Sequence, residues 1–207
     1  MGTPVPGERG GRVAGVVLAA GTSSRMGRNK LLLPWGRVSV LRHAVGTATA
    51  AGLDPLLVVL GHESERALAA LDGLPCIPLR NPDYALGINT SLRTGFSAVP
   101  EDCAAGVHLL ADMPFVTAAM LRTLVERFRS GSASLVLSTY GGLVAPPTLY
   151  GRDLFPELRA LEGDGCGRRV MKRHRAGALE VEWPVSAMAD LDEPADVERA
   201  RARLERS

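Results

Sequence analysis

Short apolar runs alternate with longer amphipathic stretches along most of this 207-residue chain, and that alternation strongly limits the possible folds. The apolar runs have the length of buried strands, and the stretches between them carry apolar residues at helical spacing. Strands that alternate with helices pair in parallel, because each helix crosses over from one strand to the next. The pattern therefore predicts an α/β fold: a single Rossmann-like domain of three layers, α/β/α, with a mostly parallel sheet.

The expected strands and helices can be placed from this pattern. The strands span residues 13–19, 56–60, 76–79, 106–111, 135–138 and 179–183. The helices span residues 40–50, 63–71, 90–98, 118–129, 154–161, 167–174 and 194–204. Residues 1–12 are rich in Gly and Pro and resemble no signal peptide, so we expect a flexible N-terminal tail there and the domain over residues 13–207.

Charge and cysteine content exclude several classes of protein. The 24 Lys and Arg residues are mixed along the chain with 22 Asp and Glu residues, which argues against a nucleic-acid partner. No apolar run approaches the roughly 20 residues that span a bilayer, so a soluble protein without a membrane partner is expected. Cys76, Cys103 and Cys166 lie far apart, which favours neither a disulfide nor a zinc site and fits the reducing cytoplasm.

The segment VVLAAGTSSRMGRNKLLLP, residues 16–34, joins an apolar strand directly to a loop of small residues that carries Arg25 and Lys30. Small residues let backbone N–H groups approach an anion closely, and the two cations can offset phosphate charge. The segment matches neither the P-loop nor the dinucleotide-binding fingerprint. It predicts a different kind of triphosphate-binding loop, and the alternative is a surface turn with incidental basic residues.

Other polar motifs also follow expected strands. In open α/β sheets, ligands bind beyond the carboxyl ends of the strands. Residues 21–30, 81–91, 112–114 and 190–192 all follow such strand ends, so we expect them to meet at one edge of the sheet.

Two aspartates in these motifs are candidates for binding Mg²⁺. Magnesium favours one or two carboxylates, with water and phosphate oxygens filling its other positions. Asp112 ends an apolar strand and Asp192 lies in the last motif, so both are predicted metal ligands. The alternatives are that Asp112 forms a turn before Pro114 and that Asp192 caps the final helix.

The run Leu-Ala-Ala-Gly-x-Ser-x-Arg-Met-Gly-x-x-Lys-Leu-Leu resembles the nucleotide-binding signature of MobA-like nucleotidyltransferases, and most closely that of molybdenum cofactor cytidylyltransferases. The similarity runs from about residue 13 to about residue 204. It implies a glycosyltransferase-A-like nucleotidyltransferase fold, with Lys30 against the triphosphate and Arg25 toward the departing pyrophosphate. The family carries a metal-binding Asp in each of the two acidic motifs, which supports Asp112 and Asp192.

Taken together, the motifs and the resemblance give one set of candidate residues. Those expected to bind the nucleotide are Leu18, Ala19, Ala20, Gly21, Arg25, Lys30, Asn81, Gly87 and Ser91. Lys30, Arg25 and Asp112 are expected to be catalytic, and no general base is assigned.

Two further segments, residues 81–95 and 146–169, also resemble the family. In relatives, the first contacts the base and ribose, although Thr90 or Ser91 could equally be an ordinary helix N-cap. In the second, three glycines surround Asp164 in a pliant loop that enters a helix. Such a loop suits an acceptor phosphate at the helix N-terminus, and a simple turn explains it nearly as well.

The motifs predict Mg²⁺-dependent transfer of a nucleoside monophosphate to a terminal phosphate, with release of pyrophosphate. The resemblance to molybdenum cofactor cytidylyltransferases implies that CMP is transferred from CTP and that the acceptor is molybdopterin. The choice of CTP follows from Ala20, because cytidylyl-type relatives carry Ala-Ala-Gly where guanylyl-type relatives tend to carry Ala-Gly-Gly. Alternatives are a guanylyltransferase, a transferase acting on another phosphorylated acceptor such as a sugar phosphate, and a non-catalytic cofactor carrier. A molybdoenzyme that receives the product is the expected protein partner.

Overall fold

A seven-stranded sheet forms the centre of the protein, with strands in the order β5-β4-β1-β6-β8-β7-β9. The computed structural model describes residues 8–23, 26–191 and 193–204. All neighbouring pairs in the sheet are parallel except those that β8 makes with β6 and β7. The strands are β1 (Arg12–Ala19), β4 (Leu56–Leu60), β5 (Ile77–Arg80), β6 (Cys103–Leu110), β7 (Leu135–Tyr140), β8 (Leu143–Gly151) and β9 (Leu179–Trp183). The predicted mostly parallel sheet is confirmed.

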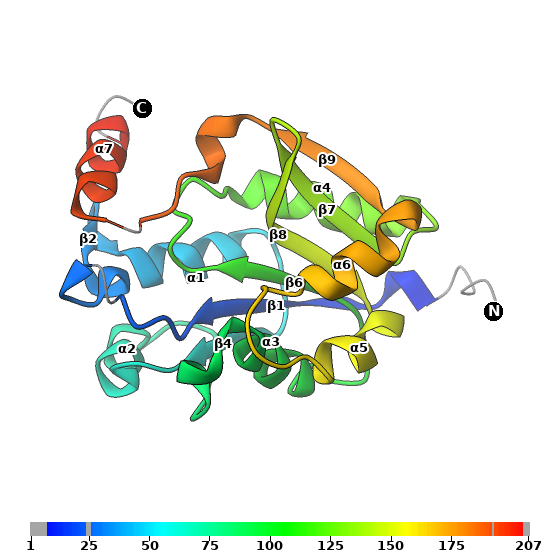
Figure 1. The fold of residues 1–207 in the computed structure, drawn as a ribbon, viewed down its shortest axis with the longest axis horizontal. Coiled ribbons are helices and arrows are strands. Elements are labelled where there is room, and N and C mark those ends of the chain that lie inside the picture. The colour runs from blue at the N-terminus through cyan, green and yellow to red at the C-terminus, as the bar shows by residue number, and fades with distance from the viewer. Residues whose placement is uncertain (1–7, 24–25, 192, 205–207) are drawn as a thin grey trace.

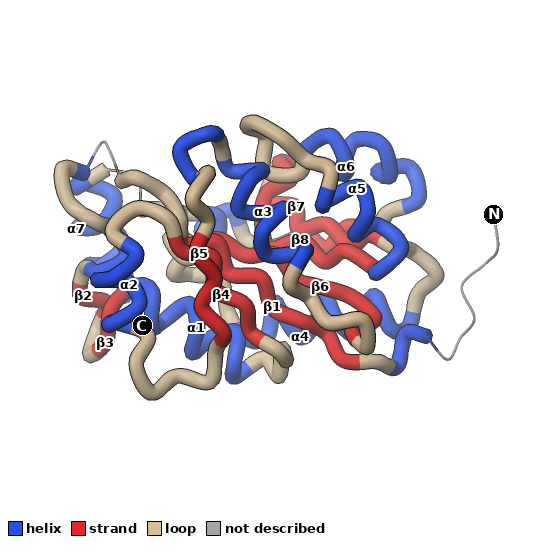
Figure 2. The backbone as a smooth tube through the Cα atoms, turned by 90° about the horizontal axis from the view of Figure 1, so that it is seen from below, coloured by secondary structure: helices blue, strands red, loops and turns tan. Residues whose placement is uncertain are grey.

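Helices cover both faces of this sheet (Figure 2). One face carries α1 (Val40–Ala50) and α4 (Ala118–Ser130), and the other carries α3 (Ile88–Ser97), α5 (Phe155–Arg159) and α6 (Arg168–His174). The helices α2 (Ser64–Ala70) and α7 (Pro194–Leu204) add buried side chains to the α1 face. A small hairpin of β2 (Pro34–Trp35) and β3 (Val38–Ser39) lies at the same end of the molecule as α7 (Figure 1).

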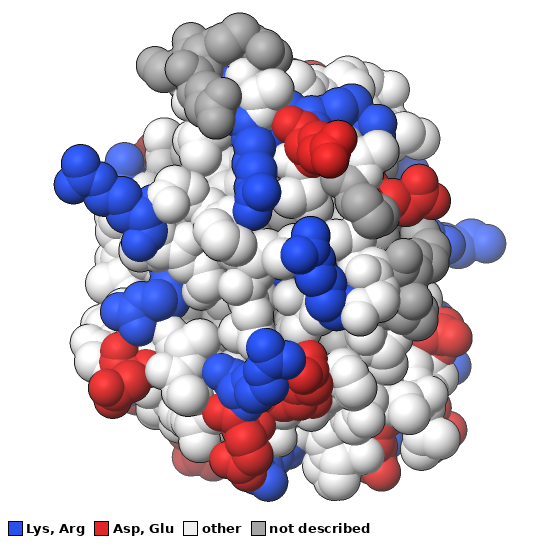
Figure 3. All heavy atoms as spheres, turned by 90° about the vertical axis from the view of Figure 1, so that its left-hand side faces the viewer, with Lys and Arg blue, Asp and Glu red and all other residues white. Residues whose placement is uncertain are grey.

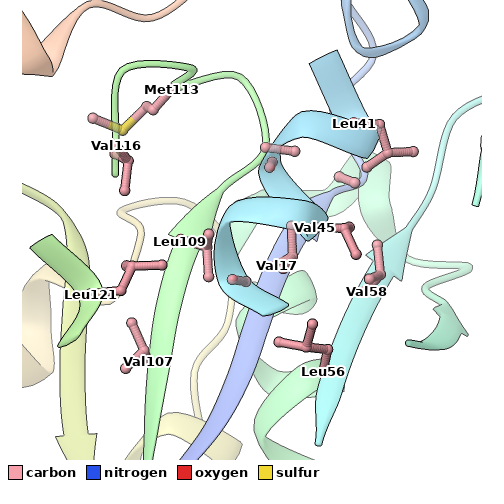
Figure 4. Close-up of a cluster of buried hydrophobic side chains, with 14 of the residues drawn as sticks. Val17, Leu41, Val45, Leu56, Val58, Val107, Leu109, Met113, Val116 and Leu121 are labelled. Atoms are coloured by element: carbon pink, nitrogen blue, oxygen red, sulfur yellow. The ribbon is translucent and has the colours of Figure 1, made fainter. Parts of the chain in front are cut away.

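The strand β1 shows why a buried parallel sheet forms from this sequence. Its side chains alternate between the two faces, and apolar residues occupy both. Val17 packs in the cluster under α1, whereas Val16 and Leu18 pack in the cluster under α3. Figure 4 shows Val17 near Val45 of α1 and Val58 of β4. The strand that leads into the small-residue loop is therefore held rigidly from both sides.

The antiparallel strand β8 was missed in the sequence analysis, because Pro146 and Pro147 argue against a central strand. Proline has no N–H group to donate to a neighbouring strand. The structure places this pair where the pairing of β7 with β8 shifts register, between Leu137 and Ser138. Ser138 Oγ donates a hydrogen bond to the carbonyl oxygen of Pro147 at 2.6 Å. The strand tolerates the prolines because they lie at this irregularity.

Arg9, which lies in the expected N-terminal tail, is packed into the fold and is 9% exposed. Arg9 donates hydrogen bonds to the carbonyl oxygens of Phe128, Ser132 and Ala133 at 3.0, 2.6 and 2.9 Å. Its guanidinium also lies 4.9 Å from the centre of the Phe128 ring. Composition alone could not show these contacts, because they join Arg9 to the end of a helix more than 100 residues away.

Basic and acidic side chains are interspersed on the face shown in Figure 3, with no continuous basic surface there. None of the helices in the described part of the chain is long and apolar enough to cross a membrane. All three cysteines are free.

Candidate active site

A cavity of about 340 Å³ opens at the carboxyl ends of β1 and β6. This volume lies in the range of small-molecule sites. The predicted residues that line it are Leu18, Ala19, Ala20, Gly21, Lys30, Gly87, Ser91 and Asp112. The expected convergence of the first loop, the segment after β5 and the end of β6 is therefore what the structure shows.

The central feature of the cavity is an ion pair between Lys30 Nζ and Asp112 Oδ2, which are 2.5 Å apart. The two side chains are 11% and 18% exposed. A partly buried pair is screened less by solvent than a surface pair. A cation and a carboxylate are thus held together where a charged ligand would enter.

Local structure fixes Lys30. It begins a short 3-10 helix, Lys30–Leu32, in which Asn29 Oδ1 accepts a hydrogen bond from the N–H of Leu31 at 3.1 Å. The backbone N–H of Lys30 donates to Ser23 Oγ at 3.2 Å, which closes the preceding loop. Leu31 is buried in the core, so the chain around Lys30 is anchored by packing as well as by hydrogen bonds.

Asp112 is fixed by the chain on both sides of it. Before it, the N–H of Ala111 donates to the carbonyl oxygen of Leu18 at 3.0 Å, which extends the contact between β6 and β1. After it, Met113 is buried in the core. The N–H of Leu191 donates to the carbonyl oxygen of Asp112 at 3.2 Å. The last acidic motif is therefore brought beside Asp112, as the sequence predicted.

Two predicted residues, Arg25 and Asp192, lie outside the described residues, so their roles stay predictions. Within the described residues, no three His, Cys, Asp or Glu side chains form a group able to hold a metal. The donor chemistry of the cavity nevertheless suits Mg²⁺. Magnesium is usually held by one or two carboxylates together with the substrate's phosphates, and Asp112 supplies such a carboxylate.

Asn81 is not among the residues that line the cavity. It is 3% exposed, and its Nδ2 donates to Thr90 Oγ1 at 2.8 Å and to Ser91 Oγ at 2.9 Å. Ser91 does line the cavity. Asn81 therefore orients the first turn of α3 without lining the cavity itself. The sequence placed Asn81 near the site, but it could not show which way its side chain points.

The N-cap alternative for Thr90 and Ser91 is wrong, because α3 begins two residues before Thr90, with Gly87 at the cap position. Thr90 Oγ1 instead donates to the carbonyl oxygen of Gly87 at 2.8 Å. Gly87 has φ +114°. A Cβ on Gly87 would lie 2.5 Å from the Gly163 carbonyl, so glycine permits this close approach.

Eight residues that line the cavity were not among the predicted site residues, namely Thr22, Ser23, Leu31, Tyr84, Ala85, Ile88, Leu110 and Asp164. Asp164 was noted only as part of a glycine-rich loop. Its Oδ1 accepts a hydrogen bond from the N–H of Ile88 at 3.3 Å. A Cβ on Gly61 would lie 2.7 Å from Cβ and from Cγ of Tyr84, so Tyr84 packs closely against this glycine. Gly61 and Gly87 were the signals in the sequence that could have indicated these contacts, because glycine allows another segment to approach the backbone closely.

Comparison with known proteins agrees with this geometry. The MobA-like NTP transferase domain matches residues 15–178. Purine catabolism protein PucB of Bacillus subtilis is 31% identical over 92% of this chain and 96% of PucB. The molybdenum cofactor cytidylyltransferase of Escherichia coli is 26% identical over 91% of this chain and 95% of that enzyme.

A solved structure shows the same fold. Rv0371C from Mycobacterium tuberculosis H37Rv, in complex with manganese, matches with a TM-score of 0.77 and 28% identity over 93% of this chain and 98% of that chain. The sequence resemblance is confirmed by these matches. The chain belongs to the family with a MobA-like NTP transferase domain, and it is a nucleotidyltransferase.

Proposed function

We propose that this protein transfers CMP from CTP to the terminal phosphate of molybdopterin, with Mg²⁺, and releases pyrophosphate. The observation that carries the proposal is the Lys30–Asp112 pair inside a cavity lined by the small-residue loop. The acceptor phosphate would attack the α-phosphorus, and the bond from the α-phosphorus to the bridging oxygen of pyrophosphate would break. No covalent intermediate with the protein is needed. The three free cysteines fit a reducing compartment, and we place the activity in the cytoplasm.

The residues of the chain contribute mainly position and charge. Nucleotidyl transfer resembles other phosphoryl-type reactions, in which the protein supplies little covalent chemistry. Lys30 would place a positive charge against the triphosphate, and the backbone of the loop at Gly21 can approach it closely. Asp112, with Asp192 as the second expected ligand, would hold Mg²⁺, which neutralises charge on the phosphates when bound. The manganese in the related Rv0371C structure supports a divalent cation in this family.

The proposed acceptor rests on the relatives. The molybdenum cofactor cytidylyltransferase of E. coli is similar to this chain over 91% of its length, and the name of that enzyme gives both the nucleotide and the cofactor. The molybdoenzyme partner stays a prediction. The test is to incubate the purified protein with each nucleoside triphosphate and with molybdopterin, a sugar phosphate or no acceptor, and to measure pyrophosphate release. Release only with CTP and molybdopterin supports the proposal. Faster release with another pair would contradict it.

Base choice gives a second, sharper prediction. Ala20 lines the cavity. If the base lies against Ala20, the Cβ would occupy space that a purine needs and a pyrimidine does not. We expect CTP to be preferred over GTP, and Ala20→Gly to relax that preference without inverting it. A methyl-sized difference is worth about 1–3 kcal/mol in such a pocket. The measurement is the ratio of kcat/KM for the two nucleotides in wild type and variant, and an unchanged ratio would remove Ala20 from base selection.

A further inference from the structure

One buried side chain joins the nucleotide side of the cavity to a loop that lies far away in the sequence. Asn89, in the first turn of α3, is 5% exposed. Its Nδ2 donates to the carbonyl oxygens of Glu162 at 2.9 Å and Asp164 at 2.8 Å. Its Oδ1 accepts from the N–H of Gly167 at 2.9 Å. Its own backbone N–H donates to the carbonyl oxygen of Gly163 at 3.0 Å.

The loop that Asn89 holds, residues 162–167, has little structure of its own. Gly163, Gly165, Cys166 and Gly167 all have positive φ, at 64°, 123°, 49° and 76°. Glycines lose much conformational freedom when they are ordered, and positive φ is strained for Cys166. The loop therefore needs contacts from outside to keep one conformation. The Asn89 amide supplies three of these contacts through both of its donors and its acceptor.

The position of the loop matters for the cavity. Gly87, Ile88 and Ser91 line it from the beginning of α3. Asp164 lines it from the loop. Asn89 does not line the cavity, so it supports the lining residues without facing the cavity itself. By holding the loop in place, Asn89 sets the distance between Asp164 and the lining residues at the beginning of α3.

We propose that residues 162–167 form the acceptor side of the active site and that Asn89 is the positioning residue that holds them there. This inference rests on the proposed function, because it assigns the second substrate of the same reaction. The loop would present its backbone to the acceptor, and the Asp164 carboxylate would face hydrogen-bond donors of the acceptor and not its phosphate, while Asn89 touches neither substrate. Loss of Asn89 should then affect the acceptor far more than the nucleotide.

Cys166 provides a reporter of loop position that does not depend on activity. The thiol is partly buried, with its Sγ 3.6 Å from Nε2 of the fully buried His108. Burial raises the pKa of the Cys166 thiol to about 12, so little reactive thiolate exists while the loop is closed. Cys103 is fully buried in β6, and burial also raises the pKa of its thiol. Release of the loop should expose Cys166 alone, whereas global unfolding should expose both.

The first arm of the test measures labelling by N-ethylmaleimide, located by mass spectrometry, in a Cys76→Ser background. In Asn89→Ala we expect Cys166 to react at least about tenfold faster, with Cys103 still protected. Asn89→Asp keeps the oxygen that accepts the hydrogen bond from the N–H of Gly167. It places a carboxylate oxygen against the carbonyl oxygens of Glu162 and Asp164, so it should release the loop at least as much as Asn89→Ala does. Thr94→Ala is the matched control, since Thr94 Oγ1 donates within α3, to the Thr90 carbonyl oxygen at 2.9 Å, and makes no hydrogen bond to the loop of residues 162–167 in the described part of the chain. It should label as wild type does.

The second arm measures steady-state kinetics with CTP and molybdopterin. For Asn89→Ala we expect the KM for molybdopterin to rise about tenfold or more, with the KM for CTP within about threefold of wild type. Unchanged Cys166 labelling, or faster labelling with an unchanged KM for molybdopterin, would overturn the proposal. If the wild-type protein transfers nothing to molybdopterin, the proposed function has failed instead. The labelling arm then still decides whether Asn89 fixes the loop.

Discussion

Replacing Asp112 with asparagine should lower the rate of nucleotidyl transfer by at least about 100-fold and leave the fold intact. The carboxylate lies 2.5 Å from Lys30 Nζ in the cavity, and it is the predicted Mg²⁺ ligand within the described residues. Asparagine keeps the size of the side chain but removes the charge that Mg²⁺ requires of its protein ligands. The measurement is pyrophosphate release with CTP and molybdopterin at saturating Mg²⁺.

A suitable control for Asp112→Asn is Asp54→Asn. Asp54 is exposed, and its carboxylate pairs with Arg12 near the beginning of β1, at the opposite end of the strand from the cavity. It should keep wild-type activity. Thermal melting separates the two interpretations of Asp112. If Asp112→Asn keeps near-normal activity and loses only thermal stability, Asp112 is a turn residue and not a metal ligand.

Replacing Lys30 with alanine should cost about 2.7–4 kcal/mol of transition-state stabilisation, which is roughly a 100- to 1,000-fold loss of kcat/KM. Lys30 is held by its place in a capped 3-10 helix, so its charge needs little rearrangement to meet a triphosphate. The fixed position makes the charge more effective than a mobile surface cation. The kinetics of the variant with CTP and molybdopterin measure this loss.

Arg37→Ala is the control for Lys30, because Arg37 is an exposed cation in the turn between β2 and β3. It should stay within about threefold of wild type. Because Lys30 and Asp112 are in direct contact, the double variant Lys30→Ala with Asp112→Asn should lose less than the product of the two single losses. A Lys30→Ala enzyme within threefold of wild type would remove Lys30 from the mechanism.

Most of the sheet could be predicted because its strands are buried on both faces and read as continuous apolar runs, as β1 and β4 do. The prediction failed at β8, where the local sequence argues against a strand but the neighbouring strands pair with it. A pair of prolines is a sound argument against a strand, and only the register shift in β7 shows how this strand accommodates them. The anchor at Arg9 was missed for a related reason, since its partners lie in distant loops.

The site was predictable to the extent that it follows from topology. Carboxyl ends of parallel strands meet at one edge, so Gly21, Lys30 and Asp112 could be brought together from sequence alone. The direction in which a side chain points could not be predicted in this way. Asn81 turns away from the cavity to bind Thr90 and Ser91, and Asn89 turns toward a loop 73 to 78 residues later. Neither contact leaves a pattern in the local sequence.

We propose that the cavity around Lys30 and Asp112 transfers the α-phosphate of CTP with its nucleoside. The most direct test compares CTP labelled with ³²P at the α-position and at the γ-position, each incubated with the protein, Mg²⁺ and molybdopterin. We expect the α-label to appear in a molybdopterin product and the γ-label in pyrophosphate, with neither transfer in Asp112→Asn. Appearance of the γ-label in inorganic phosphate or in the acceptor, with the α-label left in CDP, would contradict it.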